Sequence, residues 1–147
     1  MPVDDLHATV ARRLSGSKLR YTTSRRAIID ILSGSERPLT LPQILGSDDS
    51  LAQSSAYRNL AELIGAGAVH RIVTSDEHAH FELAEDLTEH HHHLICTSCG
   101  TVTDFTVSVQ LERQLDVALA SEAAQRGFTA EHHRLDLLGR CGACASA

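Results

Sequence analysis

The sequence has few aromatic residues and no long apolar run. Phe, Tyr and Trp make up 3% of its 147 residues, and Trp is absent, so a core must be packed from Leu, Ile, Val and Ala. Hydrophobic residues still reach 42%, enough for one ordinary domain or two small ones. Because no segment approaches the ~20 consecutive apolar residues that span a bilayer, we expect no membrane partner.

The N-terminus lacks the pattern of a secretory signal. Residues 1–5 (MPVDD) do not show the basic-then-apolar order of a signal peptide, so a cytoplasmic location is expected. Cysteine is also scarce, with 4 residues in the chain. In a reducing compartment paired cysteines are more often metal ligands than disulfides, so a metal site is the first interpretation.

A metal-ligating signature is what the sequence does contain. Every cysteine belongs to a C-x-x-C pair, formed by Cys96 with Cys99 and by Cys141 with Cys144. Such a pair on a tight turn lets two thiolates reach one tetrahedral ion, and two pairs complete a closed four-cysteine zinc site. Four histidines at residues 90–93 stand directly upstream, which indicates at least one separate site with nitrogen and oxygen ligands.

Charge is distributed unevenly. The formal net charge of −6 argues against a nucleic-acid partner. However, residues 12–26 hold six basic residues and no acidic one, whereas residues 85–147 hold nine acidic residues and four arginines. The first part of the chain is therefore predicted to face phosphate. The alternative is that the basic run is only a solvated helix face.

Apolar periodicity predicts short helices in the first half. Leu6, Val10 and Leu14 repeat at helical spacing before a Ser-Gly-Ser break at 15–17. Further helices are expected to begin at Thr22 or Thr23, at Thr40, and at Ser54 or Ser55, with Tyr57, Leu60 and Ile64 along one side of the last. Strands at 68–73 and 79–83, separated by residues 74–77, predict a hairpin. Helices followed by a hairpin indicate a winged helix-turn-helix.

The second half has a different pattern. Residues 85–89 are polar and acidic, which suggests a hinge, and strands are expected near 94–95, at 102–107 and at 132–138, with a helix at 109–125. The predicted class is α+β. It comprises a winged-helix DNA-binding domain at 1–84, a hinge at 85–89 and a small α/β metal-binding domain at 90–147.

In this order the motifs resemble the ferric uptake regulator superfamily of bacterial metal-responsive repressors. The matching pieces are residues 19–25 (LRYTTSR), 55–60 (SAYRNL) and 81–83 (FEL), the histidines joined to Cys96-x-x-Cys99-Gly100, and residues 133–144. The resemblance covers roughly residues 19–144. It implies that the four-cysteine site holds structural zinc, that residues 90–147 form a homodimer, and that the protein is not an enzyme.

The resemblance also implies two further metal sites around the histidines. Because side chains alternate along an extended segment, His91 and His93 share one face and His90 and His92 the other. The implied regulatory ligands are Glu82, His91 and His93. Many relatives add a His just before the third helix, but the matching residues 36–40 (ERPLT) contain none. We expect His80 to replace it as a ligand, with His70 as the second choice. The alternative for each is a surface histidine that binds no metal. The implied additional site comprises His90, His92, Glu112 and His133.

Metal and DNA follow from the same resemblance. Fe2+ is the expected regulatory metal and Zn2+ the alternative. Zinc-sensing relatives often place a cysteine in the regulatory site, and this sequence has no fifth cysteine. Mn2+ and Ni2+ fit the same His and carboxylate ligands. Peroxide sensing is not expected, because relatives that sense peroxide have Asp in place of Glu82. The expected DNA contacts come from Ser55, Tyr57, Arg58, Arg20 and Arg25, on double-stranded DNA with an AT-rich inverted repeat.

Two readings outside the family remain open. A zinc-buffering module without DNA would explain the cysteines and histidines, but not the ordered helices and their basic run. An enzyme with Cys96 or Cys99 as its nucleophile would need a free thiolate, and zinc-bound thiolates are poor nucleophiles.

Overall fold

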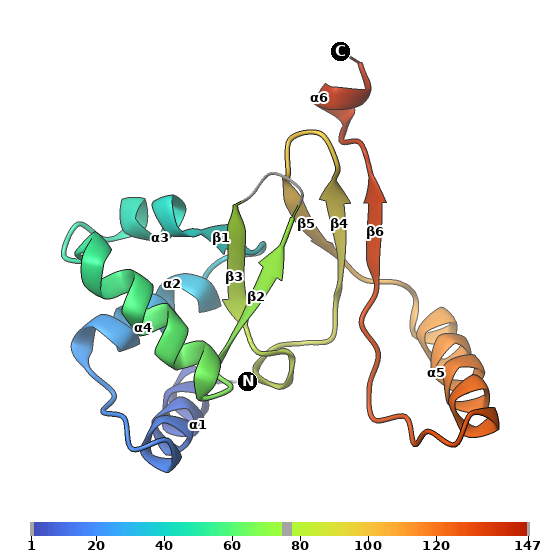
Figure 1. Ribbon diagram of the computed structural model, residues 1–147, viewed down its shortest axis with the longest axis horizontal. Helices are drawn as coiled ribbons and strands as arrows, with labels where there is room; N and C mark the ends of the chain where they lie inside the picture. The colour runs from blue at the N-terminus through green and yellow to red at the C-terminus, as the bar shows by residue number, and fades with distance from the viewer. Residues whose placement is uncertain (1, 75–77, 147) are drawn as a thin grey trace.

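The computed structural model describes residues 2–74 and 78–146, and within them two small sheets lie side by side (Figure 1). The first half contains the helices α1 (Val3–Gly16), α2 (Thr23–Ser33), α3 (Leu41–Ser47) and α4 (Gln53–Gly65), and the strands β1 (Leu39–Thr40), β2 (Val69–Val73) and β3 (Ala79–Leu83). Strand β3 pairs antiparallel with both β1 and β2. This is the predicted winged helix-turn-helix, whose expected turn at 74–77 lies mostly outside the described residues.

The helix starts follow local capping chemistry. The Thr22 side chain accepts a hydrogen bond from the Arg25 N–H, and Thr40 forms a reciprocal capping box with Gln43. Each cap satisfies backbone donors that a helix N-terminus leaves free. Both predicted caps are confirmed, whereas the two-residue strand β1 was not predicted.

Helix α4 buries one face and leaves Tyr57 exposed. Its buried residues are Ala56, Asn59, Leu60 and Leu63, which follow the 3.6-residue period, whereas Tyr57 is 63% exposed. One residue turns a helix by about 100°, so Tyr57 lies off the stripe that packs inward. Tyr57 was expected along one side of the helix with Leu60 and Ile64, and of these Leu60 is buried while Tyr57 faces outward.

One apolar cluster holds the first half together. Leucine, isoleucine and valine side chains from α1 to α4 meet the inner residues of β2 and β3, and several of them, such as Val10, Ile28 and Ile44, have no exposed surface. Fully burying one such side chain stabilises a fold by roughly 1.5–3 kcal/mol. Leu87, from the predicted hinge, belongs to the same cluster.

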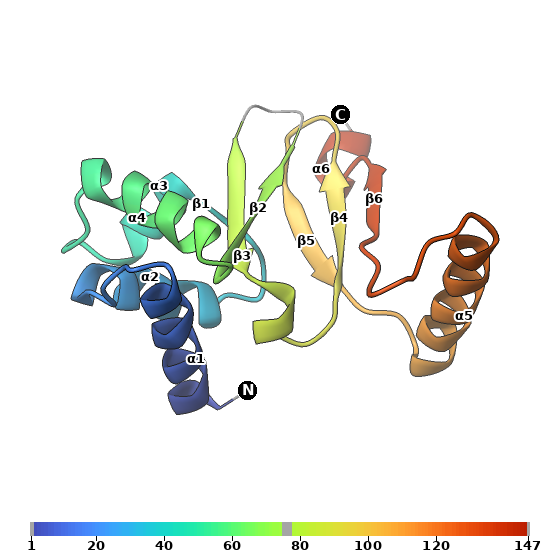
Figure 2. The same cartoon turned by 60° about the horizontal axis from the view of Figure 1, so that its bottom comes forward.

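The second half is built around strand β4. Its elements are the one-turn 3-10 helix η1 (Glu85–Leu87), β4 (His92–Cys96), β5 (Val102–Phe105), α5 (Val109–Gln125), β6 (Asp136–Gly139) and α6 (Gly142–Ala145). Strand β4 pairs antiparallel with β5 and parallel with β6. The two sheets are neighbours (Figure 2), and Ile72 of the first packs with Ile95 and Val102 of the second.

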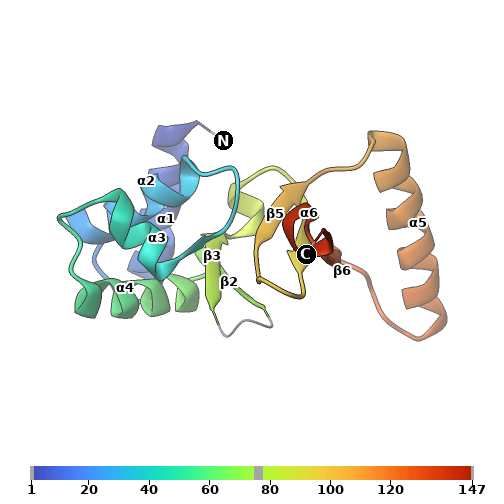
Figure 3. The same ribbon diagram turned by 90° about the horizontal axis from the view of Figure 1, so that it is seen from above.

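Helix α5 stands apart from the rest of the chain. Figure 3 shows it at the opposite end of the molecule from α1 to α4. All residues of α5 are described, and none of them is buried. Among the described residues, no helix is long and apolar enough to cross a membrane.

Candidate metal centres and DNA-facing surface

The cysteine pairs converge at the ends of β4 and β6. Parallel pairing aligns Cys96 with Gly139, which brings the turn after β6 beside the turn after β4. The sulfur atoms of Cys96, Cys99, Cys141 and Cys144 all lie within 4.8 Å of one another. This is the predicted four-cysteine cluster, and its four converging sulfur donors fit a tetrahedral zinc ion.

The thiols of this cluster oppose one another's ionisation. Backbone N–H groups of Cys141 and Cys99 point at the Cys96 sulfur and lower the pKa of its thiol to about 6. The neighbouring thiols of Cys141, Cys96 and Cys99 raise the pKa of Cys144 to about 12. Four thiolates are therefore compatible only with a cation among them, since a coordinating cation deprotonates its thiols outright.

A second cluster joins the wing to the second sheet. It contains Glu82 of β3, His91 just before β4, His93 of β4 and Asp104 of β5. The ligand atoms of these residues lie within 4.8 Å of one another. The Glu82 carboxylate is 2.9 Å from His91 Nε2 and 3.1 Å from His93 Nε2. We call this group the interdomain cluster.

Outer hydrogen bonds set both imidazoles of the interdomain cluster to present Nε2. His91 Nδ1 lies 2.9 Å from the Glu89 carbonyl oxygen, and His93 Nδ1 lies 3.1 Å from Asp136 Oδ1. A proton on Nδ1 satisfies these acceptors and leaves the Nε2 lone pair for a metal. The donor set therefore fits a divalent cation.

Electrostatics at the carboxylates support the same fit. Burial opposes ionisation of Glu82, yet the neighbouring imidazoles of His70, His93 and His91 hold its pKa well below the usual range. Burial raises the pKa of Asp104, and the nearby negative charge of Glu82 adds to the rise. Two carboxylates converging beside two imidazoles supply the negative charge that a divalent cation would balance.

Asp104 was not among the residues singled out from the sequence. A lone Asp in a strand carries no spacing signal of its own. Its position follows from register, because Asp104 is the antiparallel partner of His93. Directly opposed residues in a sheet project on the same face, so a correct β4–β5 alignment would have found it.

A third cluster lies on the other face of β4. Glu112 of α5 is 2.9 Å from His90 Nε2, 2.9 Å from His92 Nε2 and 2.7 Å from His133 Nε2. The predicted additional ligands thus come together, and we call them the α5 cluster. The alternation of the His run between two faces is confirmed by this geometry.

The α5 cluster also carries outer carboxylates. His90 Nδ1 lies 2.5 Å from Glu85 Oε1, and His133 Nδ1 lies 3.0 Å from Asp116 Oδ1. A neutral imidazole has one N–H, so it cannot donate to carboxylates on both ring nitrogens. A cation held by the Nε2 atoms and Glu112 would satisfy the whole set, in the carboxylate–histidine–metal arrangement.

The expected substitute ligands His80 and His70 stand outside the interdomain cluster. His80 is 6% exposed and lies two residues along β3 from Glu82, a rise of about 6.6 Å. His70 is nearer, with Nδ1 at 3.7 Å from Glu82 Oε1. That nitrogen accepts a hydrogen bond from Arg134 at 3.0 Å, so His70 links β2 to the segment before β6.

A cleft of about 610 Å³ opens beside these contacts. Its walls include His70 and Glu82 from the wing, His91 and His93 from the other half, and Arg134. The interdomain cluster therefore lies at a boundary that solvent can enter, which gives an ion a route to it.

The predicted DNA contacts divide into two kinds. Tyr57, Arg58 and Arg20 are exposed, and Ser55 is half-buried near the start of α4, so these residues lie on an accessible surface. Arg25 is 8% exposed. Its guanidinium donates to Asn59 Oδ1 at 3.1 Å and to the Arg20 carbonyl at 2.6 Å, and it pairs with Glu62.

Arg25 therefore links α2 to α4, and its guanidinium is not available to contact a DNA phosphate. Arg13 of the basic run is likewise used inside the molecule, where it pairs with Asp86. The sequence showed the positive charges but not their acidic partners, which lie far along the chain. The phosphate-facing charge of this region is smaller than its composition suggested.

The first half has a winged-helix fold, which is typical of DNA-binding proteins, and the second half carries clusters of metal-ligating residues. Together they define the class of metal-binding, DNA-binding proteins. The chain belongs to the ferric uptake regulator family, whose model matches residues 16–138. Members of this family are metal-responsive transcription regulators. Family membership and the winged-helix fold confirm the resemblance drawn from the sequence.

The known proteins that are similar to this chain are named for different signals, iron in some and peroxide in others. The ferric uptake regulation protein of Bordetella parapertussis is 33% identical over 136 residues, covering 89% of this chain and 93% of that protein. The peroxide operon regulator of Bacillus subtilis is 29% identical over 136 residues, covering 90% and 88%. The Helicobacter pylori ferric uptake regulator superposes with a TM-score of 0.75 at 22% identity, over 100% of this chain and 96% of that one, which shows the fold.

Proposed function

We propose that this protein is a metal-dependent DNA-binding repressor of metal-uptake or homeostasis genes, that it responds to Fe2+, and that it acts as a homodimer. One observation carries the proposal. Glu82 belongs to the wing of the DNA-binding half, whereas His91, His93 and Asp104 belong to the other half, and all converge on one point. A cation shared by these ligands would fix the DNA-binding half relative to the rest.

The ligand chemistry favours Fe2+ at the interdomain cluster. Two imidazoles with carboxylate oxygens form a donor set typical of non-haem iron sites, and no thiolate lies within the group. Mn2+ and Ni2+ fit the same donors. Zinc response is the alternative, supported by the α5 cluster, where three imidazoles and one carboxylate match a tetrahedral zinc environment.

Structural zinc is proposed for Cys96, Cys99, Cys141 and Cys144. The closed sphere of four sulfur donors leaves no position for water, so this site would stabilise the fold. The four thiols face one another and not a substrate cleft, which argues against a cysteine nucleophile. The ordered winged helix argues against a module that only buffers zinc.

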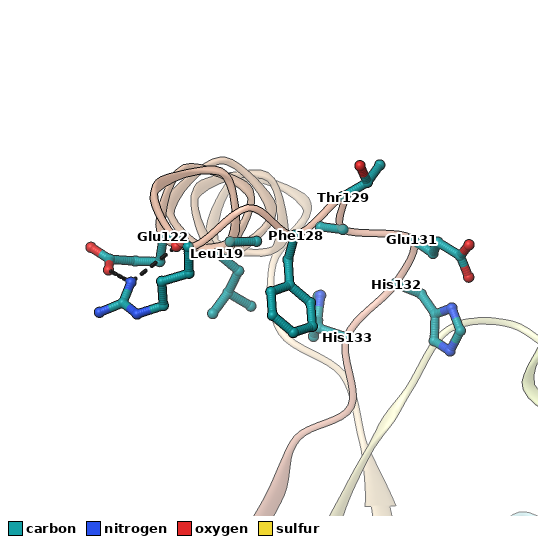
Figure 4. Close-up of a pocket in the computed structure, with 10 residues that line it drawn as sticks. Leu119, Glu122, Phe128, Thr129, Glu131, His132 and His133 are labelled. Atoms are coloured by element: carbon teal, nitrogen blue, oxygen red, sulfur yellow. Dashed lines mark hydrogen bonds and ion pairs between the residues drawn. The ribbon is translucent and has the colours of Figure 1, made fainter.

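A homodimer is supported by apolar surface that the single chain leaves open. Val109 and Val117 of α5 are 70% and 72% exposed, Leu138 of β6 is 63% exposed, and Phe128 is 74% exposed. Figure 4 shows Phe128 between Leu119 and His133 on one side of the α5 end. Burial of this surface against a second copy would remove it from water.

Two-fold symmetry sets the expected form of the operator. A symmetric dimer presents two copies of α4, so it would match an inverted repeat in the DNA. We propose Tyr57, Arg58 and Ser55 for the major groove and Arg20 for phosphate. Arg25 is omitted because its guanidinium is engaged inside the protein. AT-rich sequence is proposed from the family resemblance.

The test uses the whole protein under anaerobic conditions. Duplexes are selected from a random library with the zinc-loaded protein in the presence of Fe2+, and the affinity for the selected duplex is then measured by fluorescence anisotropy with Fe2+, Mn2+, added Zn2+ or no added metal. Metal-stimulated binding of one sequence class, strongest with Fe2+ at buffered cellular concentrations, supports the proposal. Stimulation by Zn2+ alone would favour the zinc alternative, and metal-independent binding would overturn the proposal.

A further inference from the structure

The one-turn helix η1 contacts three different parts of the molecule. A 3-10 helix has 3.0 residues per turn, so consecutive side chains point about 120° apart. Leu87 is 4% exposed and packs in the apolar cluster of the first half. Asp86 pairs with Arg13 of α1, and Glu85 lies against His90 of the α5 cluster.

Arg13 anchors this turn to the DNA-binding half. Its Nη1 donates to the Gly67 carbonyl at 2.6 Å and to Asp86 Oδ1 at 3.3 Å, and its Nη2 pairs with the other Asp86 oxygen. One guanidinium thus joins α1, the loop between α4 and β2, and η1. With Leu87 buried beside it, η1 is anchored to the first half of the chain.

Glu85 connects the same turn to the metal ligands. Its Oε1 is 2.5 Å from His90 Nδ1, while Nε2 of that ring is 2.9 Å from Glu112. The imidazole therefore stands between the hinge and α5. When a cation is bound by Nε2, the Nδ1–H becomes a stronger donor, so its hydrogen bond to a carboxylate strengthens.

We propose that Glu85 is a positioning residue that couples occupancy of the α5 cluster to the DNA-binding half, with the Asp86–Arg13 pair as its anchor. This inference rests on the proposed function, because it assigns a regulatory effect to a metal site. It provides a route separate from Glu82. Glu82 is itself a ligand, whereas Glu85 acts through His90.

The experiment separates metal affinity from transmission. Co2+ affinity is measured by its visible absorption, with the α5-cluster component identified by its loss in His133→Ala, and hydrogen exchange of residues 3–16 and 84–89 is compared with and without Co2+. Glu85→Gln keeps the size of the side chain and removes its charge. We expect Co2+ at the α5 cluster to bind about tenfold more weakly and the metal-induced protection of residues 84–89 to disappear.

The anchor should behave differently. Arg13→Met and Asp86→Asn should keep Co2+ affinity within about twofold, on the order of 0.4 kcal/mol, but lose the metal-induced protection of α1. Glu89→Gln is the matched control for Glu85, because among the described residues the Glu89 carboxylate makes no hydrogen bond or ion pair. It should leave affinity and exchange as in the wild type, and a loss there equal to that in Glu85→Gln would overturn the proposal.

The outcomes also separate this inference from the proposed function. Wild-type affinity and exchange in Glu85→Gln would overturn the inference, as would an Arg13→Met variant that loses as much Co2+ affinity as Glu85→Gln. Selected DNA is tested with the same proteins. If the DNA affinity of the wild type does not depend on metal, the repressor proposal fails and the coupling of Glu85 to DNA binding fails with it. If the wild type responds and Glu85→Gln responds equally, the inference fails alone.

Discussion

The two halves of this chain are held together by different forces. The first half buries an apolar cluster that extends from α1 to β3 and includes side chains with no exposed surface. The second half has only Ile95 and Val102 in its small cluster, together with Ile72 from the wing. Its long helix α5 buries none of its residues.

This difference assigns different sources of stability to the two halves. Apolar burial is available to a single chain at any metal concentration. The second half instead places cysteines, histidines and acidic residues at converging positions and leaves Val117 and Phe128 exposed. Its folding is therefore expected to depend on ions and on a second copy, while the first half folds by its own packing.

Removing the sulfur ligands should break this comparison most severely. In Cys96→Ser or Cys141→Ser we expect loss of about one zinc per chain and of the dimer, because ion binding of this kind contributes on the order of 10 kcal/mol to folding. Amides of α2 should remain protected from hydrogen exchange. Metal analysis and size-exclusion chromatography with light scattering provide the measurements.

The control for the cysteine variants is Ser98→Ala, which changes the same turn but no ligand. It should keep both zinc and dimer. Unchanged zinc content and dimerisation in both cysteine variants would rule out the structural role of the site.

Changes at the interdomain cluster should leave both halves folded and separate their functions. We expect Glu82→Ala, His91→Ala or His93→Ala to abolish metal-dependent DNA binding while the purified protein keeps its structural zinc, because these ligands join wing and sheet. Asp104→Asn should weaken metal binding in the same direction. Anisotropy on the selected duplex and metal analysis give the two readouts.

The two faces of the His run give a graded comparison. His90→Ala or His92→Ala should reduce the metal response more mildly than His91→Ala, and the exposed His78→Ala serves as a control. Persistent metal activation in the His91→Ala/His93→Ala double variant would place the regulatory site elsewhere.

Substitutions on the DNA-facing surface should have a moderate effect confined to the first half. Arg58→Ala is expected to weaken binding to the selected duplex by roughly 1–3 kcal/mol, with metal content unchanged. Arg20→Ala should weaken binding to all sequences alike and lower the salt slope by about 1. Arg25→Ala should instead lower the midpoint of thermal unfolding, since it leaves Asn59 and Glu62 without their partner. Wild-type affinity in Arg58→Ala would remove α4 from the interface.

The smallest metal effect is expected at His80. Because it lies outside the interdomain cluster, His80→Ala should change metal affinity by about twofold or less, measured by competition with a chelating dye. Its 6% exposure predicts a loss of thermal stability instead. A tenfold loss of metal affinity, about 1.4 kcal/mol, would identify His80 as a ligand after all.

The parts of the site that sequence predicted are those in which residue type and spacing carry the chemistry. The C-x-x-C pairs and the alternation of four adjacent histidines needed no knowledge of distant contacts. Asp104 was missed because only the register of β4 with β5 places it beside His93. The internal pairing of Arg25 with Glu62 was missed for a similar reason, since a basic residue does not reveal whether an acid will meet it.

The fold shows the same division. Helices with strong apolar periodicity and Thr caps were predicted, and so was the wing hairpin. Strand β1 was not, because its two residues form a strand only by pairing with Phe81 and His80. The polar composition of residues 85–89 suggested a hinge, and Leu87 within it is buried with the first half, a contact that polarity alone does not reveal.

In the proposed homodimer, the position of Glu112 would make metal binding at the α5 cluster depend on the concentration of the protein in the cell. This ligand is carried by α5, the helix that is proposed to pair with a second copy, so ordering of the helix by a partner and capture of an ion favour each other by mass action. Dilution of the protein would therefore weaken ion binding, and a low ion concentration would weaken dimerisation. A cell that makes more of this protein would therefore alter the threshold at which it registers its metal.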